Sequence, residues 1–115
     1  MDKNYYITTP IYYPSAKPHM GHAYSSIIAD FFARFKRMDG FDVHFLTGTD
    51  EHGLKIQRAA EKKMIDPLIF CDEISQTFRD LSKTLNLSNT DFIRTTEKRH
   101  KKSVQHLWAE LEKND

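Results

Sequence analysis

One short segment constrains the fold of this chain more than any other, the run of Pro18, His19, Met20, Gly21 and His22. Residues 5–9 before it are rich in β-branched and aromatic side chains, which favour a strand, and a long segment with helical periodicity follows it. A strand, a glycine-containing turn and a helix start are therefore expected in succession. Such a junction gathers backbone N–H groups at the positive end of a helix dipole, which suits a polyphosphate.

The composition fits one globular domain. The chain has 115 residues, 39% hydrophobic and 29% charged, which allows a core but not two full domains. Its net charge of +1 gives no global attraction to nucleic acid, so any such contact must be local. The sequence has neither a run of about twenty apolar residues nor an apolar signal-peptide stretch. We therefore expect no membrane association.

A single cysteine, Cys71, is present. It can form no internal disulfide and cannot by itself build a zinc knuckle, which is typical of a reducing compartment. We expect a cytoplasmic protein with no metal ligands in this segment. Cys71 itself is expected to be a small buried side chain.

Hydrophobic spacing predicts the elements. From Met20 to Met38 apolar residues recur at the spacing of one helix face, and Gly40 should end this helix. Residues 41–47 alternate as a second strand does, and residues 54–63 form a less regular helix with Met64 on its buried side. The pair Asp66 and Pro67 should start a third helix. Residues 92–94 suggest a short third strand.

A final helix is expected to carry four apolar side chains, with Trp108 in the core. Strands that alternate with helices predict an α/β domain with a parallel sheet, whose ligands bind beyond the carboxyl ends of the strands. The histidine turn and the turn at residues 48–53, which contains Asp50, both follow strands. If these strands are neighbours, both turns face one crevice.

Four ordered blocks resemble bacterial-type methionyl-tRNA synthetases, a family of class I aminoacyl-tRNA synthetases. Residues 8–13 (Thr-Thr-Pro-Ile-Tyr-Tyr) resemble the first strand and amino-acid pocket, and residues 19–22 resemble the class signature HIGH. Residues 45–53 and 92–96 resemble two further motifs. The resemblance implies a Rossmann-like parallel sheet flanked by helices, here incomplete. Residues 1–115 would then be the amino-terminal portion of the catalytic nucleotide-binding domain.

The resemblance also implies a reaction. Methionine attacks the α-phosphate of ATP, which enters with Mg²⁺ as a substrate, and the methionyl group then passes to tRNA. His19 and His22 would be catalytic and, with Gly21, would bind ATP. The methionine-binding residues would be Pro10, Ile11, Tyr13 and Asp50. The KMSKS-type lysine loop and the zinc-binding insertion of the family have no counterpart here, so we expect inactivity without the remainder of the synthetase chain.

Plainer alternatives stand beside these roles. The two histidines could merely cap a helix or bind adventitious metal, and Asp50 could cap the helix after it. Ile11 and Tyr13 could simply be core at a strand end. The basic run at residues 98–102 could be a solvated helix face or could help a tRNA end to approach. For the whole chain the alternatives are a nucleotidylyltransferase of the same superfamily and a non-catalytic nucleotide-binding or partner-binding module.

Overall fold

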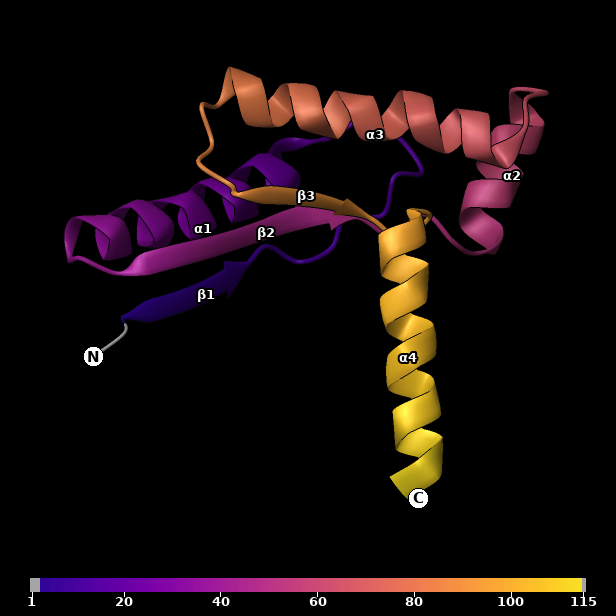
Figure 1. The fold of residues 1–115 in the computed structure, drawn as a ribbon. Coiled ribbons are helices and arrows are strands. Elements are labelled where there is room, and N and C mark those ends of the chain that lie inside the picture. The colour runs from indigo at the N-terminus through magenta and orange to yellow at the C-terminus, as the bar shows by residue number, and fades with distance from the viewer. Residues whose placement is uncertain (1–2, 115) are drawn as a thin grey trace.

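The computed structural model describes residues 3–114. Strands and helices alternate along this part of the chain, as Figure 1 shows: β1 (Asn4–Thr8), α1 (Met20–Met38), β2 (Asp42–Thr49), α2 (Leu54–Lys62), α3 (Pro67–Thr84), β3 (Asp91–Arg94) and α4 (Lys98–Asn114). The strands form a parallel sheet in the order β1-β2-β3. The predicted α/β fold is confirmed.

The central strand β2 sets the position of the polar turns. It pairs with β1 on one side, with Thr8 opposite Leu46, and with β3 on the other, with Thr49 opposite Arg94. The chain after β1 stays beside β2 for a few residues more, since Tyr12 forms an isolated parallel bridge with Thr49. The segments that follow β1 and β2 therefore leave the same edge of the sheet.

Helix α1 has the predicted bounds but not the predicted packing. It ends at Met38, with Asp39 as C-cap and Gly40 at φ 84°, as expected. Its buried face, however, consists of small or polar residues, and Ala29 and Ala33 pack on the β2 residues Val43 and Phe45. The large apolar side chains are exposed: Tyr24, Ile27, Ile28, Phe31, Phe32, Phe35 and Met38. Small side chains let the helix lie close to the sheet, and no described element covers the larger ones.

Helices α2 and α3 build a second core around the turn after β1. The cap at Asp66 is confirmed, since Oδ1 accepts hydrogen bonds from the backbone N–H groups of Leu68 (2.8 Å) and Ile69 (3.3 Å). The core cluster joins both helices to the sheet: Tyr12, Ile56, Ala60, Phe70, Cys71, Ile74, Phe78 and Phe92. The burial predicted for Met64 is wrong, because this residue follows the end of α2 at φ 55° and is 91% exposed.

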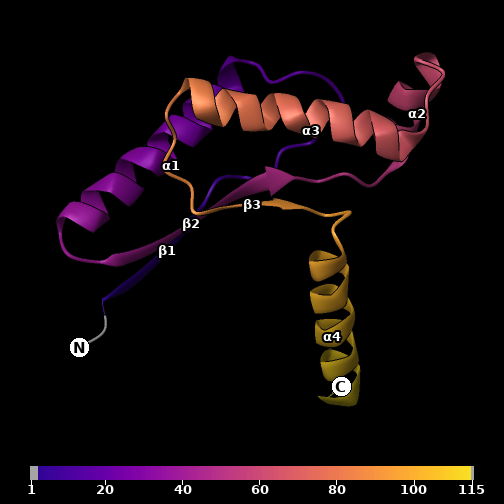
Figure 2. The same ribbon diagram turned by 45° about the horizontal axis from the view of Figure 1, so that its top comes forward.

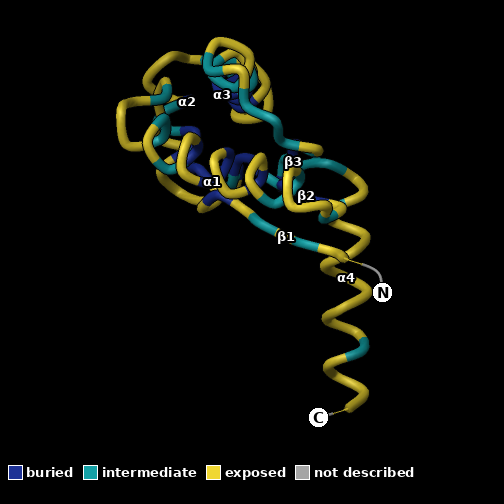
Figure 3. Tube along the Cα trace, turned by 90° about the vertical axis from the view of Figure 1, so that its left-hand side faces the viewer, coloured by how far each residue is buried: buried dark blue, intermediate teal, exposed yellow. Residues whose placement is uncertain are grey.

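Helix α4 extends away from the sheet, as Figure 2 shows from a second direction. It is exposed along most of its length, as the yellow tube in Figure 3 shows, and none of its residues is buried. Its first turn is held by Arg99, which pairs with Asp91. The core position predicted for Trp108 is wrong, since this side chain is 72% exposed. Within residues 3–114, no helix is both long and apolar enough to cross a membrane.

Candidate functional site

Two imidazole side chains close the first turn of α1. His19 is the N-cap, and its Nδ1 accepts a 3.0 Å hydrogen bond from the backbone N–H of Gly21. The Nδ1 of His22 accepts a 2.9 Å hydrogen bond from the backbone N–H of His19. Together they form a capping box around N–H groups that have no partner within the helix. The two histidines therefore do cap the helix, and their binding of ATP stays a prediction.

Capping leaves the other ring nitrogen for a ligand. A neutral imidazole whose Nδ1 accepts a hydrogen bond carries its proton on Nε2, which is then a donor. Burial lowers the pKa of His22, and electrostatic repulsion between this ring and His19 lowers it further, so the neutral form of His22 is favoured. The ring centroids lie 3.9 Å apart. Capping and donation to an anion use opposite nitrogens and are compatible.

Gly21 leaves room for one of these rings. A Cβ built on Gly21 would lie 2.8 Å from Cε1 and 3.1 Å from Nδ1 of His19. The missing side chain therefore permits the capping geometry of His19. A close approach of ATP to Gly21 stays a prediction.

Tyr12 joins the histidine turn to the end of β2. Its carbonyl accepts a 2.8 Å hydrogen bond from the backbone N–H of Asp50. Its hydroxyl donates to the carbonyl of His22 (3.2 Å) and shares a 2.8 Å hydrogen bond with Ser26. The rings of Tyr12 and Phe78 pack edge-on against the His22 ring, at 4.8 and 5.0 Å between centroids. One buried tyrosine thus connects the two polar turns.

Asp50 directly follows β2 and is half-buried. Helix α2 begins only at Leu54, and its N-cap is Gly53, which makes no side-chain cap hydrogen bond. The alternative that Asp50 caps the next helix is therefore wrong. Ammonium binding by its carboxylate stays a prediction.

The turn that carries Asp50 is fixed by a buried ion pair. The Glu51 side chain is fully buried, and its carboxylate accepts two hydrogen bonds from Arg94, from Nε (2.7 Å) and Nη2 (2.8 Å). The hydroxyls of Thr49 and Thr96 donate to the same carboxylate, at 2.6 and 2.8 Å. The hydrogen bonds that Arg94 donates to Glu51 raise the pKa of Arg94. Strands β2 and β3 are thus tied together directly beside Asp50.

Sequence reasoning singled out neither Tyr12, Glu51 nor Arg94 as positioning residues. An acidic residue after a buried strand and an arginine 43 positions later carry no pairing signal. Their partnership follows only from the parallel pairing of β2 with β3.

The expected methionine-pocket residues leave the same end of the sheet. Tyr13 donates a 2.7 Å hydrogen bond to the carbonyl of His52, and a Cβ on Gly53 would lie 2.3 Å from the Tyr13 hydroxyl oxygen. Ile11 is 49% exposed, so the alternative that it is core is wrong; it borders a cavity of about 230 Å³ at the strand ends. Pro10 is exposed. Their contact with methionine stays a prediction.

Metal-binding side chains do not cluster in the part of the chain that the structure describes. Residues 3–114 contain no group of three or more His, Cys, Asp or Glu side chains placed to hold a metal ion. The absence of zinc ligands expected from the sequence concerns this segment alone.

The fold and these contacts define a class of protein. The sheet is open and parallel, and its carboxyl-terminal edge carries a capped helix N-terminus beside an acidic turn, the usual location of a nucleotide site in α/β proteins. Residues 5–115 match the family described as tRNA synthetases class I (M). The chain belongs to this family.

Individual relatives agree with the family. The mitochondrial methionine–tRNA ligase of Takifugu rubripes is 58% identical over 110 residues, which cover 96% of this chain and 19% of that protein. The methionine–tRNA ligase of Rickettsia conorii is 58% identical over 111 residues, or 96% of this chain and 22% of that protein. The chain thus spans about a fifth of the length of these relatives.

Solved structures give the same fold. The Mycobacterium tuberculosis methionyl-tRNA synthetase in complex with methionyl-adenylate matches with a TM-score of 0.91 at 48% identity, over 93% of this chain and 21% of that chain. A leucyl-tRNA synthetase from Agrobacterium radiobacter matches with a TM-score of 0.83 at 23% identity, over 98% of this chain and 15% of that chain, and shows the fold alone. The incomplete Rossmann-like sheet expected from the sequence is confirmed.

Proposed function

We propose that the protein containing this chain joins methionine to its tRNA through a methionyl-adenylate, and that residues 1–115 form the amino-terminal portion of its catalytic domain. ATP and methionine are the substrates of the first step, with Mg²⁺ entering on ATP, and tRNA is the substrate of the second. One observation carries the proposal: the capping box and the Asp50 turn are both bonded to Tyr12 at one edge of the sheet.

In the first step the methionine carboxylate attacks the α-phosphate of ATP and pyrophosphate leaves. Negative charge shifts toward the leaving group, and donors already in place stabilise such charge most effectively. The Nε2–H groups of His19 and His22 supply these donors, while their Nδ1 atoms stay bonded to the helix start. The rings need no reorganisation during the reaction.

Methionine would lie across the ends of β1 and β2. The Asp50 carboxylate receives its ammonium group in a charge-assisted hydrogen bond. Tyr13, Ile11 and Pro10 contact the side chain, since a thioether packs well on aromatic and apolar edges. The ion pair between Glu51 and Arg94 acts on Asp50 only by positioning its turn.

The test uses methionine-dependent exchange of pyrophosphate into ATP by the complete protein. His19→Ala or His22→Ala should slow exchange by roughly 10²–10³-fold, the usual effect of losing one preorganised donor. His106→Ala on exposed α4 is the matched control and should leave the rate unchanged. Normal exchange in both site variants contradicts the proposed donors.

A second measurement separates the two substrates. Asp50→Ala should weaken methionine binding far more than ATP binding, since only the amino acid has an ammonium group. A protein that binds ATP but no methionine would instead be a nucleotidylyltransferase.

The cytoplasmic location expected from the single cysteine stays a prediction, because the relative from Takifugu rubripes is mitochondrial.

A further inference from the structure

The side chain of Tyr12 makes a buried polar contact at the first turn of α1. Tyr12 is 7% exposed and Ser26 is 2% exposed. A phenol has a single proton. Because Tyr12 donates this proton to the carbonyl of His22, Ser26 is the donor in the 2.8 Å hydrogen bond between the two hydroxyls. The hydroxyl of Tyr12 therefore ties the segment after β1 to two residues of α1.

The same tyrosine limits the orientation of the His22 ring. The rings of Tyr12 and Phe78 meet the imidazole at interplanar angles of 76° and 78°, and they stack on each other with centroids 5.7 Å apart. The Nδ1 of His22 is bonded to the backbone N–H of His19. With Nδ1 held and two aromatic rings against the imidazole, the direction of Nε2 is fixed as well.

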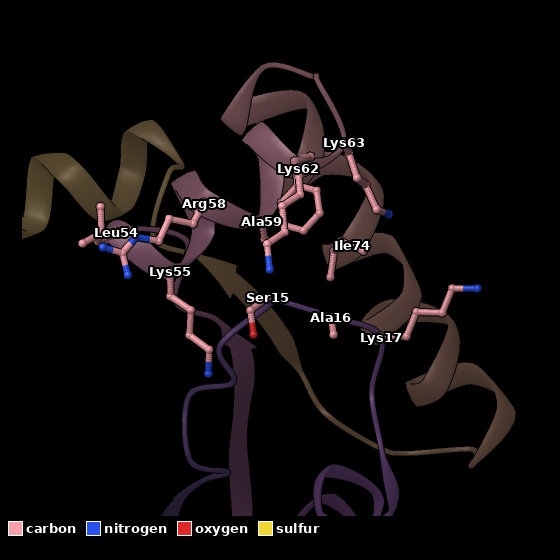
Figure 4. Close-up of a pocket in the computed structure, with 11 residues that line it drawn as sticks. Ser15, Ala16, Lys17, Leu54, Lys55, Arg58, Ala59, Lys62, Lys63 and Ile74 are labelled. Carbon is pink, nitrogen blue, oxygen red and sulfur yellow. The ribbon is translucent and has the colours of Figure 1, made fainter.

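The chain between Tyr12 and the histidine turn does not provide this order. Residues 15–17 border the largest cavity, which measures about 830 Å³ and separates them from α2 and α3, as Figure 4 shows. Five cations line this cavity: Lys17, Lys55, Arg58, Lys62 and Lys63. Ala16 and Lys17 are exposed. The connecting segment therefore has an open side, and the side chain of Tyr12 supplies a direct link that bypasses it.

The backbone of Tyr12 has a separate task. Its carbonyl accepts the 2.8 Å hydrogen bond from the N–H of Asp50, and its N–H donates a 3.1 Å hydrogen bond to the carbonyl of Gly48. Both bonds involve main-chain atoms alone, so they do not depend on the side chain. The backbone of Tyr12 thus holds the turn of Asp50, while its side chain holds the turn of His22.

We propose that Tyr12 is a positioning residue for adenylate formation, which acts through His22 and touches neither substrate. Its hydroxyl holds the first turn of α1 and its ring holds the imidazole, so that the Nε2–H of His22 meets the phosphates of ATP in one geometry. This role rests on the proposed function. The position of a donor matters in such a step, because a displacement of about 1 Å can lower a rate by roughly 10²-fold.

The first test removes the hydroxyl alone. Tyr12→Phe in the complete protein keeps the ring and both backbone hydrogen bonds. It should lower kcat for methionine-dependent pyrophosphate exchange about tenfold, a smaller loss than removal of the His22 donor itself. The affinity for methionine should stay unchanged, since the Asp50 turn keeps its hydrogen bond to the Tyr12 carbonyl.

Tyr6→Phe is the matched control, because Tyr6 is 62% exposed and lies within β1 rather than beyond its carboxyl end. Both kcat and the affinity for methionine should match those of the unmodified protein. An unchanged kcat in Tyr12→Phe, or an equal loss in Tyr6→Phe, would overturn the proposal. So would a tenfold loss of methionine affinity in Tyr12→Phe.

A double-mutant cycle shows whether Tyr12 acts through His22. In the His22→Ala protein the hydroxyl has no imidazole left to position, so adding Tyr12→Phe should change the exchange rate by less than about twofold. A general loosening of the fold would lower the rate in both backgrounds. A further tenfold loss in the His22→Ala protein therefore contradicts the proposal.

Ser26→Ala tests the same contact if Tyr12→Phe does not fold. This variant removes one hydrogen bond from the hydroxyl and keeps the donation to His22. It should lower kcat by about threefold, the effect of one neutral hydrogen bond, and only while His22 is present. No loss, or the same loss without His22, would count against the positioning role.

Failure of the proposed function would be recognised separately, because the unmodified protein would then show no methionine-dependent exchange. The NMR signals of the His22 ring would in that case decide the role of Tyr12. They should shift in Tyr12→Phe and stay unchanged in Tyr6→Phe. Unshifted signals in both variants would show that Tyr12 does not position the ring.

Discussion

His22 accepts a 2.9 Å hydrogen bond on its Nδ1 from the backbone N–H of His19, and the two imidazoles lie 3.9 Å apart between centroids. This arrangement requires an unprotonated Nδ1 on His22. A proton there would remove the acceptor and place a charge in a partly buried position. The helix cap is therefore linked to pH.

Stability should follow the titration of His22. Its pKa in the folded state lies below the usual 6.5, because burial and electrostatic repulsion between the two imidazoles disfavour the imidazolium form of His22. Between the lowered pKa and pH 6.5 the unfolded chain therefore binds a proton that the folded chain does not. The free energy of unfolding consequently falls as the pH falls from 6.5 to the lowered pKa. Above pH 6.5 this group does not change the free energy of unfolding.

Chemical denaturation at several pH values checks this expectation. His22→Gln should remove the component of the pH dependence that lies just below 6.5, and His106→Gln on α4 should keep it. An identical pH profile for His22→Gln and the unmodified protein would assign the dependence to another group.

The buried pair of Glu51 and Arg94 should dominate the stability of the acidic turn. Arg94→Met leaves the Glu51 carboxylate fully buried without its cation, which should cost about 3–5 kcal/mol in the free energy of unfolding. Lys113→Met breaks an exposed pair with Glu110 and should cost about 0–1 kcal/mol. Denaturant titration compares the two variants. Adding Glu51→Gln to Arg94→Met should recover part of the loss, and a further loss would contradict the uncompensated charge.

Cys71 should resist thiol reagents in the folded state. The side chain is 1% exposed, and burial together with the charge of Glu51 raises the pKa of the thiol to about 11. The thiolate needed for reaction is therefore scarce at neutral pH. We expect the thiol to be labelled only as fast as the protein unfolds. The labelling is followed by absorbance with an aromatic disulfide reagent. Labelling of the native protein as fast as that of the denatured chain would disprove this expectation.

The exposed apolar face of α1 should make the 115-residue polypeptide bind hydrophobic dyes. Phe31 and Phe35 are 64% and 54% exposed on this face, and exposed apolar patches of this kind promote association. Phe31→Ser with Phe35→Ser should reduce dye fluorescence and light scattering, whereas Glu73→Ser on α3 should change neither. Unchanged fluorescence in the double variant would show that the dye binds elsewhere.

Local sequence signals predicted most of the elements. Asp66 before Pro67 identified the start of α3, and Gly40 identified the end of α1, because both depend on hydrogen bonds or backbone angles within a few residues. Alternation of strands and helices likewise predicted the parallel sheet. The histidine turn was located for the same reason, since its capping box spans only residues 19–22.

Burial was predicted less well, because periodicity shows which side chains share a face but not what covers that face. Trp108 and the large apolar residues of α1 are exposed, while Ala29 and Ala33 pack on the sheet. Small side chains such as these fill a contact between a helix and a sheet only where the two backbones lie close together.

The sequence by itself determined the order of the elements, their caps and the residue types at the two polar turns, since these follow from interactions between near neighbours in the chain. The tertiary structure alone decided that Tyr12 bonds to both turns, that Arg94 neutralises Glu51, and that five cations surround one cavity. These contacts join residues ten or more positions apart in the chain. Their geometry exists only after the parallel strands have paired and the helices have packed on them.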